Sequence, residues 1–176
     1  VTAHRIGIPE HPYRSSKGGS MQQTPERIQH LWNRLATIGG FTYESRPGPR
    51  SLTGWQGEGR GLVQIDDSNA DERHFIEQGE FQLQNGQIVE MHNRFIWRKT
   101  TSGIVLSHGR RGEPVFLFEL IPTTDGLWKS AQDHVCINDL YSGELRESAN
   151  GFELTWHITG PKKDEHLFYR YFPDNS

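Results

Sequence analysis

Groups that can do chemistry are concentrated in the last third of the sequence. They are a histidine, a thiol, a carboxylate, two lysines and two tyrosines: His134, Cys136, Asp139, Tyr141, Lys162, Lys163 and Tyr169. Side chains of these types transfer protons, ligate metals or bind anions. The stretches that carry them alternate like strands and are separated by turn residues, which predicts a small barrel with a polar-lined interior.

His134 and Cys136 stand two residues apart, so on a regular strand they share one face. Such a pair can supply two metal ligands or a thiol–imidazole nucleophile. Zinc needs three or four ligands, and the nearby candidates His92, His108 and Asp139 match no established spacing. We therefore expect no metal site, and we interpret Cys136 as a small packed hydrophobe beside a hydrogen-bonded histidine.

His134 is also the candidate general acid or base of an enzyme. Asp139 would orient it, and Tyr141 or Arg110 would stabilise developing negative charge. A bulge near Asn138 would bring His134 and Tyr141 to the same side. The chemistry would be that of a cofactor-free isomerase, cyclase or hydrolase, and the sequence leaves open whether the protein is an enzyme.

Cations at predicted turns form a second candidate set. His108 and Arg110 end one strand, and Lys162 lies in a later turn. Cations at the rim of a barrel can hold a carboxylate or phosphate, and arginine offers a bidentate grip. The competing interpretation of each is solvated turn charge.

Composition limits the function classes. The 176 residues carry a net charge of −3 with a pI near 6.3, which gives no electrostatic reason to expect nucleic acid or an anionic membrane as partner. The single cysteine cannot form an internal disulfide, and neither a signal peptide nor a membrane-length apolar run is visible. We expect a cytoplasmic protein with an extension or linker over residues 1–23 and one domain over residues 24–176.

One helix is predicted, with Thr24 as its cap, Pro25 in its first turn and Gly39-Gly40 as its end. Its apolar stripe is Ile28, Leu31, Trp32, Leu35 and Ile38. Strands are predicted at 41–46, 54–66, 73–84, 87–99, 104–108, 114–122, 134–147, 151–159 and 165–172. The fold class is therefore mainly β, an antiparallel up-and-down barrel of about eight to ten strands with one N-terminal α-helix, because closure removes exposed edges.

Alternation assigns faces to these strands. Residues 91–97 place Asn93 among aromatics on one face, and Trp156 lies on the apolar face of residues 151–159. Gly57, Gly59 and Gly61 share a face, which is typical of a strongly coiled strand where chains approach closely. This run lacks the strand–loop–helix context and the lysine of a phosphate loop.

The chain resembles an uncharacterised family of small calycin-like proteins known only as a domain of unknown function. Matching motifs, in order, are GWQGEGRG at 54–61, NRFIW at 93–97, SHGRRG at 107–112, PVFLF at 114–118, HVC at 134–136, DLY at 139–141, LTW at 154–156, GPKKD at 160–164 and YRY at 169–171. The resemblance covers roughly residues 30–172 and implies a lipocalin-like barrel, without an established activity. The glycine-rich opening is similar to that of nitrobindin-type haem barrels, and the overall pattern to bilin lyases, at the level of fold alone.

The leading functional prediction is a barrel that binds a small, largely apolar or amphipathic molecule through a polar handle. Haem or a bilin is a sub-case, and a barrel with a solid core and a structural role is a third interpretation. The predicted ligand-binding residues are Asn93, Trp97, His108, Arg110, Cys136, Trp156, Lys162 and Tyr169, and the predicted catalytic residues are His134, Asp139 and Tyr141.

Overall fold

The computed structural model describes residues 19–52, 56–131, 134–136 and 138–174, without the side chains of 19–22 and 134–136. The described residues form one helix, α1 (Gly19–Leu35), and eleven strands. The strands are β1 (Ile38–Pro47), β2 (Gly57–Asp66), β3 (Glu72–Leu83), β4 (Ile88–Lys99), β5 (Ile104–Arg110), β6 (Glu113–Pro122), β7 (Leu127–Ser130), β8 (His134–Cys136), β9 (Asp139–Glu147), β10 (Phe152–Thr159) and β11 (Asp164–Pro173).

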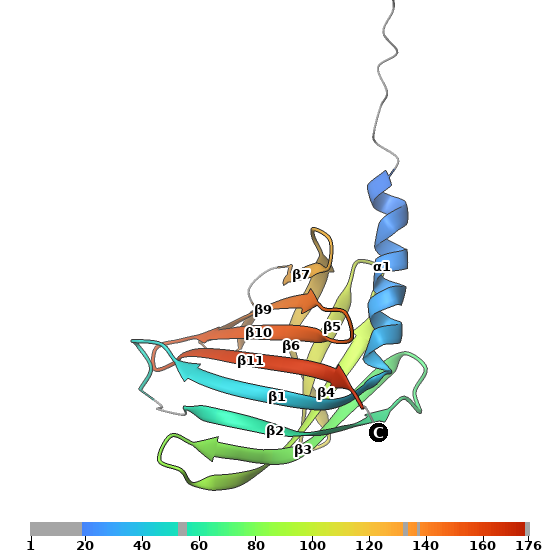
Figure 1. Cartoon of the computed structure of the whole chain (residues 1–176). Helices are drawn as coiled ribbons and strands as arrows, with labels where there is room; N and C mark the ends of the chain where they lie inside the picture. The colour runs from blue at the N-terminus through green and yellow to red at the C-terminus, as the bar shows by residue number, and fades with distance from the viewer. Residues whose placement is uncertain (1–18, 53–55, 132–133, 137, 175–176) are drawn as a thin grey trace, which may run out of the picture.

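Every strand pairing is antiparallel, and the sheet closes on itself. The order is β10-β11-β1-β2-β3-β4-β5-β6-β7-β9, and the pairing of β9 with β10 completes a barrel of ten strands. β8 pairs with the first part of β9, beside β7 on the same edge. The predicted antiparallel barrel with one N-terminal helix is thus confirmed (Figure 1).

Two elements differ from the sequence prediction. Residues 134–147 were expected to form one strand, but the chain turns back after Cys136, and Asn138 takes a positive φ of 73° in the turn. β8 and β9 are therefore the two arms of a hairpin. β7 was not predicted because its four residues are too few to show a period.

The helix boundaries also differ. α1 begins at Gly19, so Pro25 lies inside the helix, where it removes one backbone hydrogen bond, instead of in the first turn. The helix ends at Leu35, and Gly39 and Gly40 belong to β1. A Cβ at Gly40 would collide with the ring of Phe172 on β11, so close strand packing explains this glycine. Residues 1–18, most of the expected extension, lie outside the described residues.

α1 covers one end of the barrel, where β1 begins and β11 ends (Figure 1). Its stripe of Ile28, Leu31, Trp32 and Leu35 is 0–5% exposed and joins the core cluster of the barrel. Arginines attach the helix to the turns at this end: Arg27 donates to the carbonyls of Thr123 and Thr124 at 2.6 and 2.8 Å, and Arg34 donates to those of Ser148 and Gly151. The described residues contain no helix with the length and apolarity of a transmembrane span.

The glycines of β2 allow β2 and β3 to approach closely. Gly61 lies opposite Gly79, and a Cβ on either would collide with the backbone of the partner strand. Over Gly59, the rings of Tyr43 and Phe81 from the two flanking strands meet with centroids 5.6 Å apart. These contacts support barrel closure as the reason for the alternate glycines, while Trp55 lies outside the described residues.

We expect Gly61→Ala to lower the free energy of unfolding by about 1–3 kcal/mol, because the new methyl group meets backbone atoms that cannot rotate away. Urea denaturation followed by circular dichroism measures the change. Leu62→Ala is the matched control, since Leu62 is adjacent, faces outward and is 70% exposed. Equal stabilities of the two variants would contradict the close-approach explanation.

Candidate ligand site inside the barrel

A buried carboxylate lies at the centre of the barrel wall. Glu77 on β3 is 1% exposed, and its position between Phe75 and Phe81 on the inner face surrounds it with apolar side chains. Tyr171 Oη donates to Glu77 Oε2 at 2.5 Å, and the side-chain amide of Asn93 donates a further hydrogen bond. Glu77 Oε1 is buried and has no hydrogen-bond partner among the described residues.

Burial controls the protonation of Glu77. Loss of hydration disfavours the charged form and raises the pKa of Glu77 from 4.5 to about 8, although the hydrogen bonds from Tyr171 and Asn93 act in the opposite direction. Glu77 is therefore mostly protonated at neutral pH. A protonated carboxyl that already accepts from Tyr171 has an O–H left to donate.

Three tyrosine rings form the wall beside Glu77. Tyr169 stacks on Tyr171 with centroids 5.2 Å apart and lies 4.7 Å from Tyr43. Burial raises the pKa of Tyr43 to about 12 and that of Tyr169 and Tyr171 well above the usual value. These phenols stay protonated at physiological pH and act as hydrogen-bonding groups rather than as bases.

A pocket of about 400 Å³ reaches Glu77 from the barrel wall. β4 and β5 pair only from Phe95–His108 to Lys99–Ile104, so the strands separate beyond this point. Asn93 and His108 line the pocket together with Glu77. The opening therefore connects the buried carboxyl with the surface.

His108 stands at this opening with its ring 5.2 Å from that of Phe95. Arg110 Nε donates to His108 Nδ1 at 3.3 Å. Burial, together with the positive charge of Arg110, lowers the pKa of His108, which favours the neutral ring with its proton on Nε2. Arg110 thus contacts His108 at the end of β5, although only His108 lines the pocket.

Two tryptophans of the same core also carry polar atoms without partners. Trp97 is fully buried and Trp156 is 5% exposed. The indole Nε1 of each is buried and bonds to no group among the described residues. The sequence placed both on the inner face, and the structure packs Trp156 against Phe95 at 5.3 Å and Trp97 against Phe75 at 5.5 Å.

The predicted catalytic residues lie on the β8–β9 hairpin. Backbone register sets His134 opposite Tyr141 and Cys136 opposite Asp139. The side chains of His134 and Cys136 lie outside the described residues. Tyr141 is half-buried against the core, and Asp139 is 3.4 Å from Lys163 Nζ, so its carboxylate forms an ion pair with the β10–β11 turn.

The predicted rim cations do not all join the pocket. Lys162 is exposed in the turn between β10 and β11, and Arg110 is exposed at the end of β5. His108 and Asn93 line the pocket, and Tyr169 lies in the aromatic wall behind it. The structure therefore brings together Asn93, His108 and Tyr169 around Glu77. It leaves Lys162 in the β10–β11 turn and Asp139 at the start of β9.

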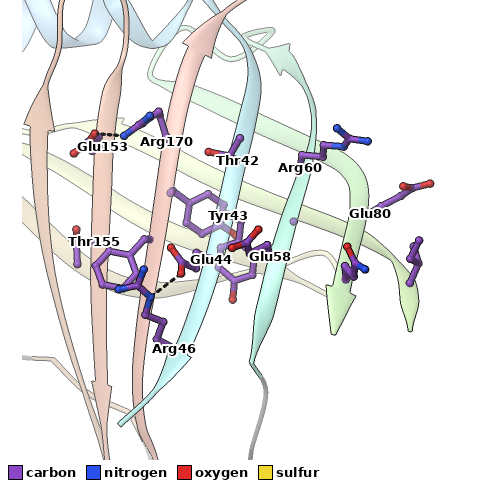
Figure 2. A pocket seen from close by; sticks show the side chains of 15 residues that line it. Thr42, Tyr43, Glu44, Arg46, Glu58, Arg60, Glu80, Glu153, Thr155 and Arg170 are labelled. Carbon is purple, nitrogen blue, oxygen red and sulfur yellow. Dashed lines mark hydrogen bonds and ion pairs between the residues drawn. The ribbon is translucent and has the colours of Figure 1, made fainter. Parts of the chain in front are cut away.

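A second hollow, of about 720 Å³, lies on the outer face of the barrel over β10, β11, β1, β2 and β3 (Figure 2). Its charged side chains carry both signs, and several pair with one another: Arg46 with Glu44 at 2.6 Å and Arg170 with Glu153 at 2.9 Å. Because these charges compensate one another, the hollow does not select a ligand of one sign. The pocket that reaches Glu77 through the barrel wall is the stronger candidate site.

The model of a family of unknown function, DUF6314, matches residues 46–172. The chain belongs to the DUF6314 family. The match spans β2 to β11 and leaves α1 outside. No curated protein matches the chain. Membership of DUF6314 agrees with the predicted resemblance to a domain of unknown function and assigns no activity.

Glu77, the central residue of this candidate site, was not among the residues predicted from the sequence. The signal was present, because alternation from Phe75 to Phe81 puts Glu77 and Gly79 on an otherwise aromatic inner face. A lone glutamate on such a face is either a register error or a functional group. Alternation was used to assign the inner and outer faces of the strand at 91–97, but not those of the strand at 73–84.

Proposed function

We propose that this protein is a calycin-like barrel that binds a small, largely apolar molecule and holds its polar handle at Glu77. The observation that carries the proposal is the buried Oε1 of Glu77, which lacks a partner in an aromatic interior that a pocket connects with the surface. A buried polar group without a hydrogen bond costs about 1–3 kcal/mol. A bound ligand that supplies the missing partner removes this cost.

The chemistry of the handle follows from protonation. At neutral pH the carboxyl of Glu77 has an O–H to donate, and the Nε1 atoms of Trp97 and Trp156 are also donors. Each of these three groups can therefore donate a hydrogen bond to an acceptor atom of a ligand. We propose that the handle is an acceptor oxygen, such as a carbonyl or a carboxyl group, attached to an apolar body that fits the aromatic wall.

The test is a thermal-shift series at pH 6.5 with ligands of one chain length and different heads. A fatty acid, a ketone, an amine and an alkane form the series, and haem and biliverdin are added as large amphipathic probes. Binding at 100 times Kd stabilises the protein by about 2.7 kcal/mol. We expect the ketone or acid to raise Tm and the alkane and amine to have little effect.

Glu77→Met is the site variant, because it keeps the length of the side chain and removes the donor, and Glu80→Met is its control, because Glu80 lies on the same strand and is exposed. The proposal predicts a smaller ligand shift in Glu77→Met than in the wild type and an unchanged shift in Glu80→Met. Absence of any shift with every probe, together with no small molecule in an organic extract of the purified protein, would overturn it. A buried water would then be the partner of Oε1.

A second candidate function uses the same carboxyl as a general acid. A carboxyl with a pKa of about 8 holds its proton at neutral pH and can release it to a bound molecule. This candidate moves the acid–base role from His134 to Glu77. Mass spectrometry of a bound ligand before and after incubation tests this candidate. An enzyme would convert the ligand in the wild type, whereas Glu77→Gln would still bind the ligand but no longer convert it.

A further inference from the structure

Two histidines and an aspartate gather on the outer face of the barrel, away from the pocket at Glu77. His157 on β10 lies directly opposite His166 on β11, and their rings stack with centroids 4.2 Å apart and an interplanar angle of 15°. Asp164 is two residues before His166 on the same face of β11. The register of two neighbouring strands thus brings the three side chains together.

The ligand atoms of the three residues converge. Asp164 Oδ1 is 3.1 Å from His157 Nε2 and 3.7 Å from His166 Nε2, and all three atoms lie within 4.8 Å of one another. Around a tetrahedral zinc ion with bonds of about 2.0–2.2 Å, neighbouring ligand atoms stand about 3.3–3.6 Å apart. Small side-chain rotations therefore suffice to place one ion within bonding distance of all three.

The carboxylate of Asp164 is fixed in place by the loop after β1. Its side chain is 8% exposed, and Gly48 leaves room for Oδ2, since a Cβ there would collide with it. The backbone N–H of Arg50 donates to the carboxylate, and Arg50 Nε lies 3.8 Å from Oδ2. The loop therefore contacts Oδ2, while Oδ1 faces the two histidines. In metal sites, hydrogen bonds to the outer side of a ligating carboxylate orient it in the same way.

Two features favour a metal ion over a simple ion pair. Both Nε2 atoms point to one carboxylate oxygen, although only that of His157 is within hydrogen-bond distance. The two rings also stack with their centroids 4.2 Å apart, and an ion bound to both Nε2 atoms would hold them in this arrangement. The histidine side chains are 39% and 40% exposed, so an ion there would remain open to solvent.

We propose that His157, Asp164 and His166 form a binding site for a divalent transition-metal ion. Two imidazole nitrogens and one carboxylate oxygen are a ligand set suited to Zn²⁺ and its neighbours in the first transition row. The fourth position is left for water or another small ligand. This site is independent of the proposed ligand pocket.

The test uses Zn²⁺ as the probe with the full chain, stripped with a chelator and titrated against a chromophoric competitor at pH 7.5. We expect one tight Zn²⁺ per chain. His157→Gln and His166→Gln should each weaken that site by more than about 100-fold, because loss of a ligand costs at least as much as loss of an outer-shell partner. Urea midpoints close to the wild-type value show that the variants remain folded.

His92→Gln is the matched control, because His92 also lies on an outer face beside a carboxylate, 3.7 Å from Glu90, but belongs to no metal-ligating group among the described residues. Its affinity for Zn²⁺ should equal that of the wild type. When Co²⁺ replaces Zn²⁺, the wild type should show visible absorption bands of the bound ion, and His157→Gln should not. Wild-type affinity in both site variants, or an equal loss in His92→Gln, would overturn the proposal.

Discussion

The Glu77→Gln variant is expected to be more stable than the wild type at pH 8, and the difference should shrink toward pH 5. Glu77 is protonated in the folded protein up to a pKa of about 8, whereas in the unfolded chain its pKa is 4.5. As pH rises above 4.5, the unfolded chain releases the proton but the folded protein keeps it. Rising pH therefore favours unfolding, and stability falls across the window from 4.5 to 8.

The expected magnitude is large for one residue. The rise in the pKa of Glu77 from 4.5 to about 8 corresponds to a decrease in the free energy of unfolding on the order of 4 kcal/mol between pH 4.5 and pH 8. Below pH 4.5 both states hold the proton, and the stabilising effect is fully present. Glutamine has the same shape, stays neutral throughout and can still accept from Tyr171, so the variant should lose this pH dependence.

Urea denaturation of both proteins at pH 5, 6, 7 and 8 measures the effect as a difference, which cancels the titration of the histidines. Glu80→Gln on the same strand is the control, since its exposed carboxyl should leave the pH dependence unchanged. Parallel stability curves for the wild type and Glu77→Gln would show that Glu77 is ionised in the folded protein. The donor chemistry proposed for the pocket would then be wrong.

Leu31→Ala is expected to lower the free energy of unfolding by about 2–5 kcal/mol. Leu31 is fully buried where α1 closes the barrel, and it belongs to the same core cluster as Phe41 and Trp97. Truncation leaves a cavity between the helix and the strands that neither can fill, because both are fixed by their own hydrogen bonds. For a chain of this size the loss corresponds to a fall in Tm of roughly 4–20 °C.

Differential scanning calorimetry gives Tm, and urea denaturation gives the free energy. Glu26→Ala is the control on the same helix, because Glu26 is exposed and alanine is a good helix former. A loss below 1 kcal/mol for Leu31→Ala would show that the helix contributes little to the barrel. α1 would then be a dispensable addition to the part that the family model matches.

Hairpin turns were predictable because their chemistry is local. Gly86 has a φ of +89° in the turn between β3 and β4, which explains the Asn-Gly signal there. The Gly160 turn between β10 and β11 is closed by a hydrogen bond from Gly160 N to Lys163 O. The helix ends were less predictable, since Gly39 and Gly40 look like a helix stop but serve strand packing in β1.

The candidate site was predicted in part. Asn93 was named from alternation, His108 as a cation at the end of a strand and Tyr169 as a core aromatic, and the structure places all three around Glu77. The choice of His134 as the centre rested on the chemical types in one stretch of chain, and its side chain lies outside the described residues. Glu77 was overlooked because its hydrogen-bond donor Tyr171 lies 94 residues later in the sequence, on β11.

The sequence by itself determined the fold class, because alternation, turn residues and an amphipathic helix are local patterns that any barrel of this kind must show. It also determined which face of most strands is apolar. Tertiary structure decided which polar groups meet, since the pairing of β1 with β11 joins the two ends of the barrel sequence and brings Tyr171 to Glu77, 94 residues earlier in the chain. The raised pKa of Glu77 and the convergence of His157 with Asp164 follow from burial and register, which exist only in the folded chain.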